Sequence, residues 1–176
     1  MYDSYGLFIN NQWRAASSGK TQDVIDPATE DRVGAIPTAN AADLDEALAA
    51  AAKAQPGWAA TSGWQRSQIL RAIANELRGI IEKAALTMAR ECGKPLAEAR
   101  GEFNAAIDQF DWYADEARRI FGHSLSGRDP GVRLDVVYHP VGPVAAFSAW
   151  NFPALLPARK MAAALAAGCT IIVKPS

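Results

Sequence analysis

Two polar side chains near the end of the chain have the types and spacing to bind an anionic or polarised ligand. Asn151 carries a neutral amide, which donates hydrogen bonds without titrating, and Lys174 carries a fixed positive charge. An amide donor can stabilise an oxyanion that develops during a reaction, because it does not compete for the proton. The simpler alternatives are that Asn151 caps a helix and that Lys174 is a solvated charge at a strand end.

The elements around these two residues predict a βαβ unit that brings them together. Residues 144–147 and 169–173 are short apolar runs of strand length, and residues 154–167 are rich in alanine and leucine and end at Gly168. A strand, a helix and a strand with short joints imply a parallel sheet with a right-handed crossover. Ligands bind outside the carboxyl ends of such strands, where Asn151 and Lys174 fall.

The first forty residues predict short strands. Residues 7–9 and 12–14 predict a tight hairpin with its turn at Asn10 and Asn11. Residues 24–26 and 32–36 predict two further strands, joined by a turn at residues 27–30.

The middle of the chain predicts three helices. Asn40 and Ser62 are expected to cap the first two. The first helix should end or kink at residues 55–57, and its apolar face contains Leu44, Ala47, Leu48, Ala51 and Trp58. A long apolar stripe from Ile69 to Met88 is expected to break at Gly79 and to end at Gly93. A third helix should run from Pro95 to Gly122, and residues 132–138 predict a strand.

Composition indicates an ordinary globular protein. The 176 residues are 49% hydrophobic and 21% charged, with a formal net charge of −1. This balance gives no indication of nucleic acid or anionic membrane as partners. Two cysteines are too few for a disulfide framework and suit the reducing cytoplasm. Residues 1–14 lack the pattern of a signal peptide, and Arg159 and Lys160 interrupt the longest candidate for a membrane span.

Several motifs resemble the NAD(P)-dependent aldehyde dehydrogenase superfamily. The most specific are Ala149-Trp150-Asn151-Phe152-Pro153 and the run from Gly168-Cys169-Thr170 to Val173-Lys174-Pro175-Ser176. Further matches follow the family order upstream, namely Ile9-Asn10-Asn11-Gln12-Trp13, Asp26-Pro27-Ala28-Thr29, Glu91-Cys92-Gly93-Lys94-Pro95 and the segment ending at Phe121-Gly122. The resemblance therefore covers nearly the whole chain.

The resemblance implies an α/β fold, truncated relative to the family. Residues 1–130 would form N-terminal strands and helices of the cofactor-binding domain, residues 131–140 a strand of the oligomerisation arm, and residues 141–176 the first, incomplete βαβ unit of a Rossmann-like parallel sheet. Family members are much longer, so we expect an N-terminal piece of such an enzyme, with an unpaired sheet edge.

The resemblance also implies site residues. Asn151 would be the oxyanion donor, and the Lys174 ammonium would contact the adenosine ribose of NAD or NADP. Trp150, Pro175 and Ser176 would line the same cofactor cleft, together with Asn151 itself. The choice between NAD and NADP is left open.

Arg159 is a candidate for substrate binding. In the succinate-semialdehyde branch, which the sequence resembles most, an arginine at this place binds the distal carboxylate of the substrate. A planar guanidinium suits a carboxylate because it can donate two parallel hydrogen bonds. The alternative is a surface arginine beside Lys160.

The cysteines and histidines are not expected to form the reactive centre. Cys169 opens a buried strand, which predicts an inert core thiol, and Cys92 lies at a helix end and is expected to be structural. By resemblance, the family's cysteine nucleophile and activating glutamate lie downstream. His123 and His139 have no ligand spacing, so we expect no metal site.

We therefore expect the complete enzyme to oxidise an aldehyde, with a semialdehyde as the favoured substrate, to the carboxylic acid with NAD(P). It should be a cytoplasmic homo-oligomer, and residues 1–176 alone should be inactive. One alternative is a non-catalytic fragment that acts as a cofactor-binding or assembly module, and another is an unrelated βαβ binding module.

Overall fold

The computed structural model describes residues 6–176, which form thirteen elements. The first part contains β1 (Leu7–Ile9), β2 (Gln12–Arg14), β3 (Thr21–Ile25), β4 (Arg32–Pro37), α1 (Ala41–Ala60), α2 (Gly63–Arg78), α3 (Ile81–Cys92) and α4 (Leu96–Ala117). The second part contains β5 (His123–Ser126), β6 (Arg133–Val136), β7 (Val144–Phe147), α5 (Leu155–Ala166) and β8 (Ile171–Lys174). Within these residues no helix is long and apolar enough to cross a membrane.

Two antiparallel hairpins open the fold, as the turn signals predict. β1 pairs with β2, and the two turn residues Asn10 and Asn11 have φ of 50° and 63°. Asparagine tolerates this left-handed conformation, which a two-residue hairpin turn requires. β3 pairs with β4, with an irregularity in register after Val24.

The predicted βαβ unit is confirmed. β7 and β8 are parallel, with Val144 opposite Ile171 and Phe147 opposite Lys174, so both strands end at the same edge. Lys174 is the last residue of β8 rather than the residue after it. Between the strands, α5 is followed by Gly168, whose φ of 83° suits glycine at the end of a helix.

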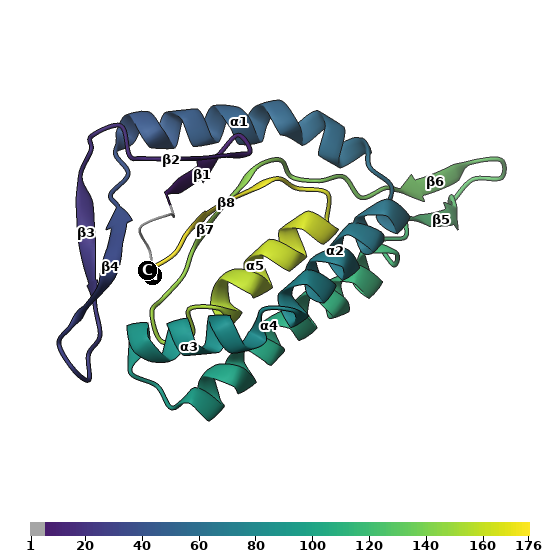
Figure 1. Cartoon of the computed structure of the whole chain (residues 1–176). Helices are drawn as coiled ribbons and strands as arrows, with labels where there is room; N and C mark the ends of the chain where they lie inside the picture. The colour runs from purple at the N-terminus through teal and green to yellow at the C-terminus, as the bar shows by residue number, and fades with distance from the viewer. Residues whose placement is uncertain (1–5) are drawn as a thin grey trace.

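The helices pack in layers around α5. Figure 1 shows α5 between the β7–β8 pair and a layer formed by α2 and α4, with α1 across the other side of the strands. Alanines dominate the core, which allows the helix axes to approach closely. The core comprises Leu70, Ala74, Ala85, Met88, Ala99, Phe103, Ala106, Ile107, Phe110, Ala114, Ala117, Ala158, Ala162 and Ala166.

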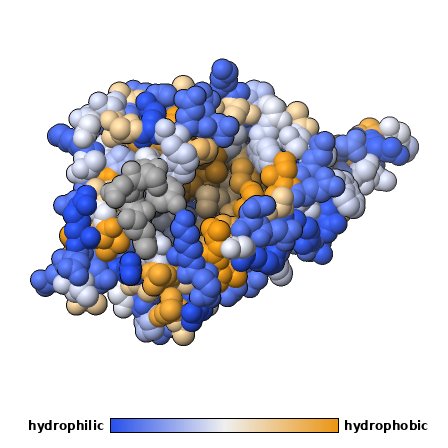
Figure 2. All heavy atoms as spheres, in the orientation of Figure 1, coloured by the Kyte–Doolittle hydropathy of each residue, from blue (hydrophilic) through white to orange (hydrophobic). Residues whose placement is uncertain are grey.

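One face of the molecule is hollowed and apolar. Figure 2 shows hydrophobic side chains gathered in the middle of this face, around β7, β8 and α5. Next to this region, the large side chains of Phe147 and Trp150 are 70% and 74% exposed. The two-stranded parallel sheet therefore leaves apolar surface in contact with solvent at the point where its strands end.

One predicted helix end is wrong, and one predicted apolar face is more exposed than expected. The sequence predicts an end or a kink at residues 55–57; α1 contains Pro56 and continues to Ala60, so the end does not occur there. Leu44 and Leu48 on the predicted apolar face of α1 are about half exposed. The third predicted helix ends at Ala117 instead of Gly122. Gly122 meets β6 instead, since a Cβ there would lie 2.3 Å from the carbonyl oxygen of Val136. The close approach of two backbones therefore explains this glycine better than a helix end.

Asp43 joins the first hairpin to α1. Its carboxylate accepts hydrogen bonds from the N–H of Ser17 at 3.0 Å and of Asn40 at 3.0 Å, and it pairs with Arg14 at 3.3 Å. Asn40 completes the predicted capping box by accepting from the N–H of Asp43. The N–H of Asn40 foremost, and then that of Ser17, hold the pKa of Asp43 below its ordinary value of 3.8, against the opposing effect of burial.

Replacing Asp43 with asparagine should therefore remove a pH-dependent part of the stability. Because the pKa is lowered on folding, this carboxylate stabilises the protein above its unfolded value of 3.8 and loses its effect as the pH falls through the folded pKa. Urea unfolding of the wild type and of Asp43→Asn should differ most at neutral pH and converge in acid. The exposed neighbour Asp45→Asn serves as the control. An equal difference at every pH would contradict this account.

Candidate functional site

The loop between β7 and α5 carries Asn151 to the carboxyl edge of the parallel strands. The loop leaves the sheet beside β8, because the N–H of Ser148 donates to the carbonyl oxygen of Lys174 at 3.3 Å. Asn151 and Lys174 are both exposed at this edge. The topology therefore places the two predicted side chains at neighbouring strand ends.

Asn151 is not the cap of α5. The helix begins at Leu155, and its N-cap residue is Ala154. The alanine side chain cannot accept a hydrogen bond from the free N–H groups of the first turn. A residue from another helix does so instead. Glu102 of α4 accepts hydrogen bonds through Oε1 from the N–H of Ala154 at 2.8 Å and of Leu155 at 3.1 Å. A carboxylate at a helix N-terminus also interacts favourably with the helix dipole.

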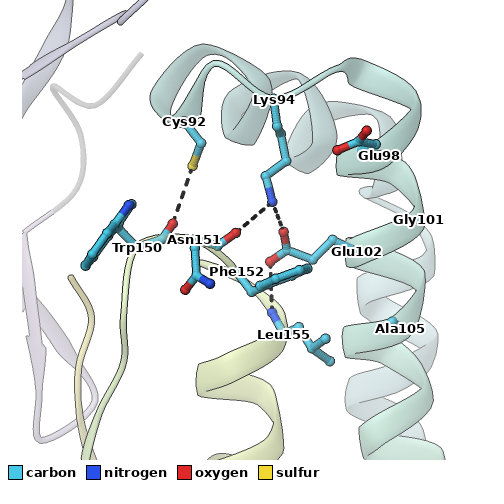
Figure 3. A pocket seen from close by; sticks show the side chains of 10 residues that line it. All are labelled: Cys92, Lys94, Glu98, Gly101, Glu102, Ala105, Trp150, Asn151, Phe152 and Leu155. Carbon is cyan, nitrogen blue, oxygen red and sulfur yellow. Dashed lines mark hydrogen bonds and ion pairs between the residues drawn. The ribbon is translucent and has the colours of Figure 1, made fainter.

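Lys94 connects this carboxylate to the Asn151 loop. Its Nζ forms an ion pair with Oε2 of Glu102 and donates to the carbonyl oxygen of Asn151 at 3.1 Å. It also lies 4.9 Å from the ring centroid of Phe152. The side chains of Lys94 and Glu102 are only 14% and 2% exposed, so both charges are largely removed from water. Figure 3 shows this chain of contacts from the α3–α4 connection to the loop.

A pocket of about 610 Å³ lies between the Asn151 loop and α4. Figure 3 shows that the backbone carbonyl of Asn151 points to Lys94, whereas its amide side chain points away from Lys94. The contact with Lys94 therefore uses the backbone of Asn151 and not its side-chain amide. The volume is in the range of small-molecule sites. The lining residues are Cys92, Lys94, Glu98, Gly101, Glu102, Ala105, Trp150, Asn151, Phe152 and Leu155.

Cys92 lines this pocket, yet its surroundings disfavour the reactive thiolate. Its Sγ lies 3.9 Å from the carbonyl oxygen of Trp150, to which the thiol donates. Burial raises the pKa of the Cys92 thiol, and the charge of Glu91 raises it further, against a smaller opposing effect of Lys94. Since the thiolate is the nucleophilic form, this environment fits a structural cysteine.

The remaining predicted residues lie in different places. Trp150, Pro175 and Ser176 are exposed at or beyond the ends of β7 and β8. Arg159 is exposed on α5 and is outside the group that lines the pocket. Cys169 is only 3% exposed, between α5 and β8. In residues 6–176, no three histidine, cysteine or acidic side chains are grouped so that they could hold a metal ion.

Sequence reasoning missed Lys94 and Glu102. Glu102 had a detectable signal, because it falls on the stripe of α4 that also buries Ala99, Phe103 and Ala106. An acidic residue at a buried helical position predicts a specific partner. Lys94 stands between Gly93 and Pro95, and only the tertiary structure reveals which groups it contacts.

Comparison with known proteins finds similarity along nearly the whole chain. Among curated relatives, the chain is 41% identical to the glutarate-semialdehyde dehydrogenase of Pseudomonas putida and 40% identical to the succinate-semialdehyde dehydrogenase [NADP(+)] of Escherichia coli; each match covers 96% of this chain and 35% of the relative. The crystal structure of the succinate-semialdehyde dehydrogenase from Burkholderia pseudomallei superposes with a TM-score of 0.95 at 41% identity, over 98% of this chain and 36% of that one.

The chain thus spans about a third of the length of the proteins it matches. The model of the aldehyde dehydrogenase family matches residues 13–176, which is nearly the whole chain. The fold, the motifs and these matches lead to one conclusion: the chain belongs to the aldehyde dehydrogenase family.

Proposed function

We propose that this chain forms the oxyanion-binding and cofactor-binding part of an NAD(P)-dependent dehydrogenase that oxidises a semialdehyde to the carboxylic acid. The observation that carries the proposal is the position of the Asn151 loop, which lies at the carboxyl edge of β7 and β8 and is anchored to α4. Neither Cys92 nor Cys169 is assigned the role of nucleophile, because burial raises the pKa of the Cys92 thiol and Cys169 is buried.

Asn151 is the residue assigned to the chemistry. Addition of a thiolate to the aldehyde carbon converts the carbonyl oxygen into an oxyanion. The side-chain amide of Asn151 donates to this oxygen and stays neutral at every working pH. Its backbone carbonyl is engaged by Lys94, so the donor is presented by a loop that is fixed on its other side. Loss of hydride from the same carbon and hydrolysis of the resulting thioester then yield the acid.

The edge beyond β7 and β8 is assigned to binding a dinucleotide. Bound NAD(P) would supply the hydride acceptor. Lys174 ends β8 with an exposed ammonium, which is assigned to the ribose hydroxyls, and Trp150, Pro175 and Ser176 are assigned to the same cleft. The relatives support a nicotinamide cofactor, since one of them is a succinate-semialdehyde dehydrogenase named for NADP(+). The resemblance to the family implies these roles, and the position of the residues at the carboxyl ends of parallel strands supports them.

A substrate with a distal carboxylate is favoured. Both curated relatives reported above are named for semialdehydes that carry one. Arg159 is exposed on the helix that follows the Asn151 loop, and its guanidinium is assigned to this carboxylate. An aldehyde without the carboxylate would leave Arg159 without its partner.

The β5–β6 hairpin is assigned to assembly. All residues of both strands are exposed, including Leu125 and Leu134, each 53% exposed. Exposed apolar side chains on a projecting hairpin are typical of a surface that another copy covers. The proposed enzyme is therefore a homo-oligomer. Its free cysteines favour the reducing cytoplasm as its location. If the natural polypeptide has no dehydrogenase activity, the exposed hairpin favours the second candidate function, which is a non-catalytic assembly module.

The proposal is tested on the natural polypeptide that carries these residues. Reduction of NAD and of NADP is measured with succinate semialdehyde, with glutarate semialdehyde and with butanal, which matches the first in carbon number but lacks the carboxylate. We expect turnover with a semialdehyde and a much higher KM for butanal. Cofactor binding without any turnover would support the assembly module and contradict the enzyme.

A further inference from the structure

We propose that Lys94 and Glu102 form a positioning pair that fixes the Asn151 loop for the reaction. The inference rests on the proposed oxyanion role of Asn151. It adds the two residues whose contacts fix the position of the Asn151 loop relative to α4. In this proposal neither side chain contacts substrate or cofactor. Their role is to hold the backbone from which the amide projects.

The pair holds the loop at two points, its middle and its junction with α5. Lys94 donates to the carbonyl oxygen of Asn151 at 3.1 Å, which fixes the peptide next to the donor side chain. Glu102 accepts from the N–H groups of Ala154 and Leu155 at 2.8 and 3.1 Å, which fixes the start of α5. The ion pair between the two side chains couples these anchors. Residues 151–155 are therefore attached to α4 and to the connection before it through one largely buried pair.

A buried pair serves this purpose better than an exposed one. At 14% and 2% exposure, these charges have few alternative partners in water, and their geometry is set by the surrounding packing. Arg100 and Glu82 offer the contrast. They bridge α3 and α4 at 2.8 Å, but they are 44% and 70% exposed, and their ion pair lies outside the Asn151 loop. Of these two ion pairs of α4, only the Lys94–Glu102 pair contacts the Asn151 loop.

Kinetics of the natural polypeptide test the role of Lys94. Lys94→Met should lower kcat by about 100-fold, the size expected when a catalytic group is displaced by about 1 Å, with little change in the KM for the cofactor. In an Asn151→Ala background the same substitution should have little further effect, because Lys94 acts through Asn151. A general structural defect would lower kcat equally in both backgrounds and would overturn the proposal.

Two further variants separate positioning from loss of folding. Lys94→Met leaves the Glu102 carboxylate buried without its cation, so the double variant Lys94→Met with Glu102→Gln removes both charges and retains an acceptor for Ala154 and Leu155. It should fold and still show the loss of kcat. Arg100→Met is the matched control and should leave kcat unchanged. Wild-type kcat in the double variant would contradict the role of Lys94.

Hydrogen–deuterium exchange gives a readout that does not depend on activity. Lys94→Met should speed exchange in the peptide that contains residues 148–156, and Glu102→Ala should speed it more, whereas Arg100→Met should not. If the wild type oxidises no aldehyde, the proposed function fails, and exchange in this peptide still decides whether the pair holds the loop. Unchanged exchange in both variants would overturn the positioning pair.

Discussion

Replacing Asn151 with alanine should lower kcat for aldehyde oxidation by about 10²–10³, the usual effect of removing one oxyanion donor. The amide lies in a loop at the carboxyl edge of β7, and its backbone is engaged by Lys94. The side chain caps no helix, since Glu102 satisfies the start of α5. The loss should therefore fall on the transition state, with the thermal unfolding midpoint and the KM for the cofactor nearly unchanged.

Two controls make the Asn151 result specific. Asn104→Ala removes an exposed amide on α4 that donates to the carbonyl oxygen of Arg100, within the same helix, and it should leave kcat at the wild-type value. Asn151→Asp keeps the shape of the side chain but introduces a negative charge, which repels the oxyanion, so its loss should be at least as large. Wild-type kcat in Asn151→Ala would exclude this residue from the chemistry.

Replacing Glu102 with alanine should destabilise the fold by about 3–5 kcal/mol, the usual effect of removing one partner of a buried ion pair. The carboxylate is 2% exposed and has three partners, namely Lys94 and the N–H groups of Ala154 and Leu155. Its loss leaves a buried ammonium without a counter-charge and two helix donors without an acceptor. Urea unfolding followed by circular dichroism of the purified protein measures this difference.

The neighbouring acid on α4 provides the control for Glu102. Glu98 is exposed and lines the same pocket, so Glu98→Ala should change the free energy of unfolding by no more than about 0.5 kcal/mol. Glu102→Gln retains an acceptor and should lie between alanine and the wild type. A loss below about 1 kcal/mol for Glu102→Ala would mean that the pair contributes little beyond its desolvation.

Local signals in the sequence were sufficient for the βαβ unit and the caps. Strand-length apolar runs, an alanine-rich helix and Gly168 are all contiguous, so they predict β7, α5 and β8 with errors of a few residues. The capping boxes at Asn40 and Ser62 are equally local. The βαβ topology makes β7 and β8 parallel, so both strands end at the same edge of the sheet. This topology therefore also predicts that Asn151 and Lys174 lie at neighbouring strand ends.

Long-range contacts explain what sequence reasoning missed. Glu102 contacts Ala154 across 52 positions, and Lys94 contacts Asn151 across 57, so no local pattern reveals either partner. Gly122 resembles a helix end in the sequence, but it is required by a backbone approach to Val136. The exposure of Leu44 and Leu48 likewise depends on which surfaces α1 meets in the fold.

A crystal structure of the natural polypeptide, trapped with an aldehyde-derived adduct and cofactor, would test the central claim most directly. The account predicts that Nδ2 of Asn151 lies about 2.7–3.1 Å from the oxygen of the former aldehyde, a distance expected for a preorganised oxyanion donor. Lys94 should still contact the carbonyl oxygen of Asn151 in that complex. An adduct whose oxygen is bound by other donors, with the Asn151 amide turned away, would contradict the account.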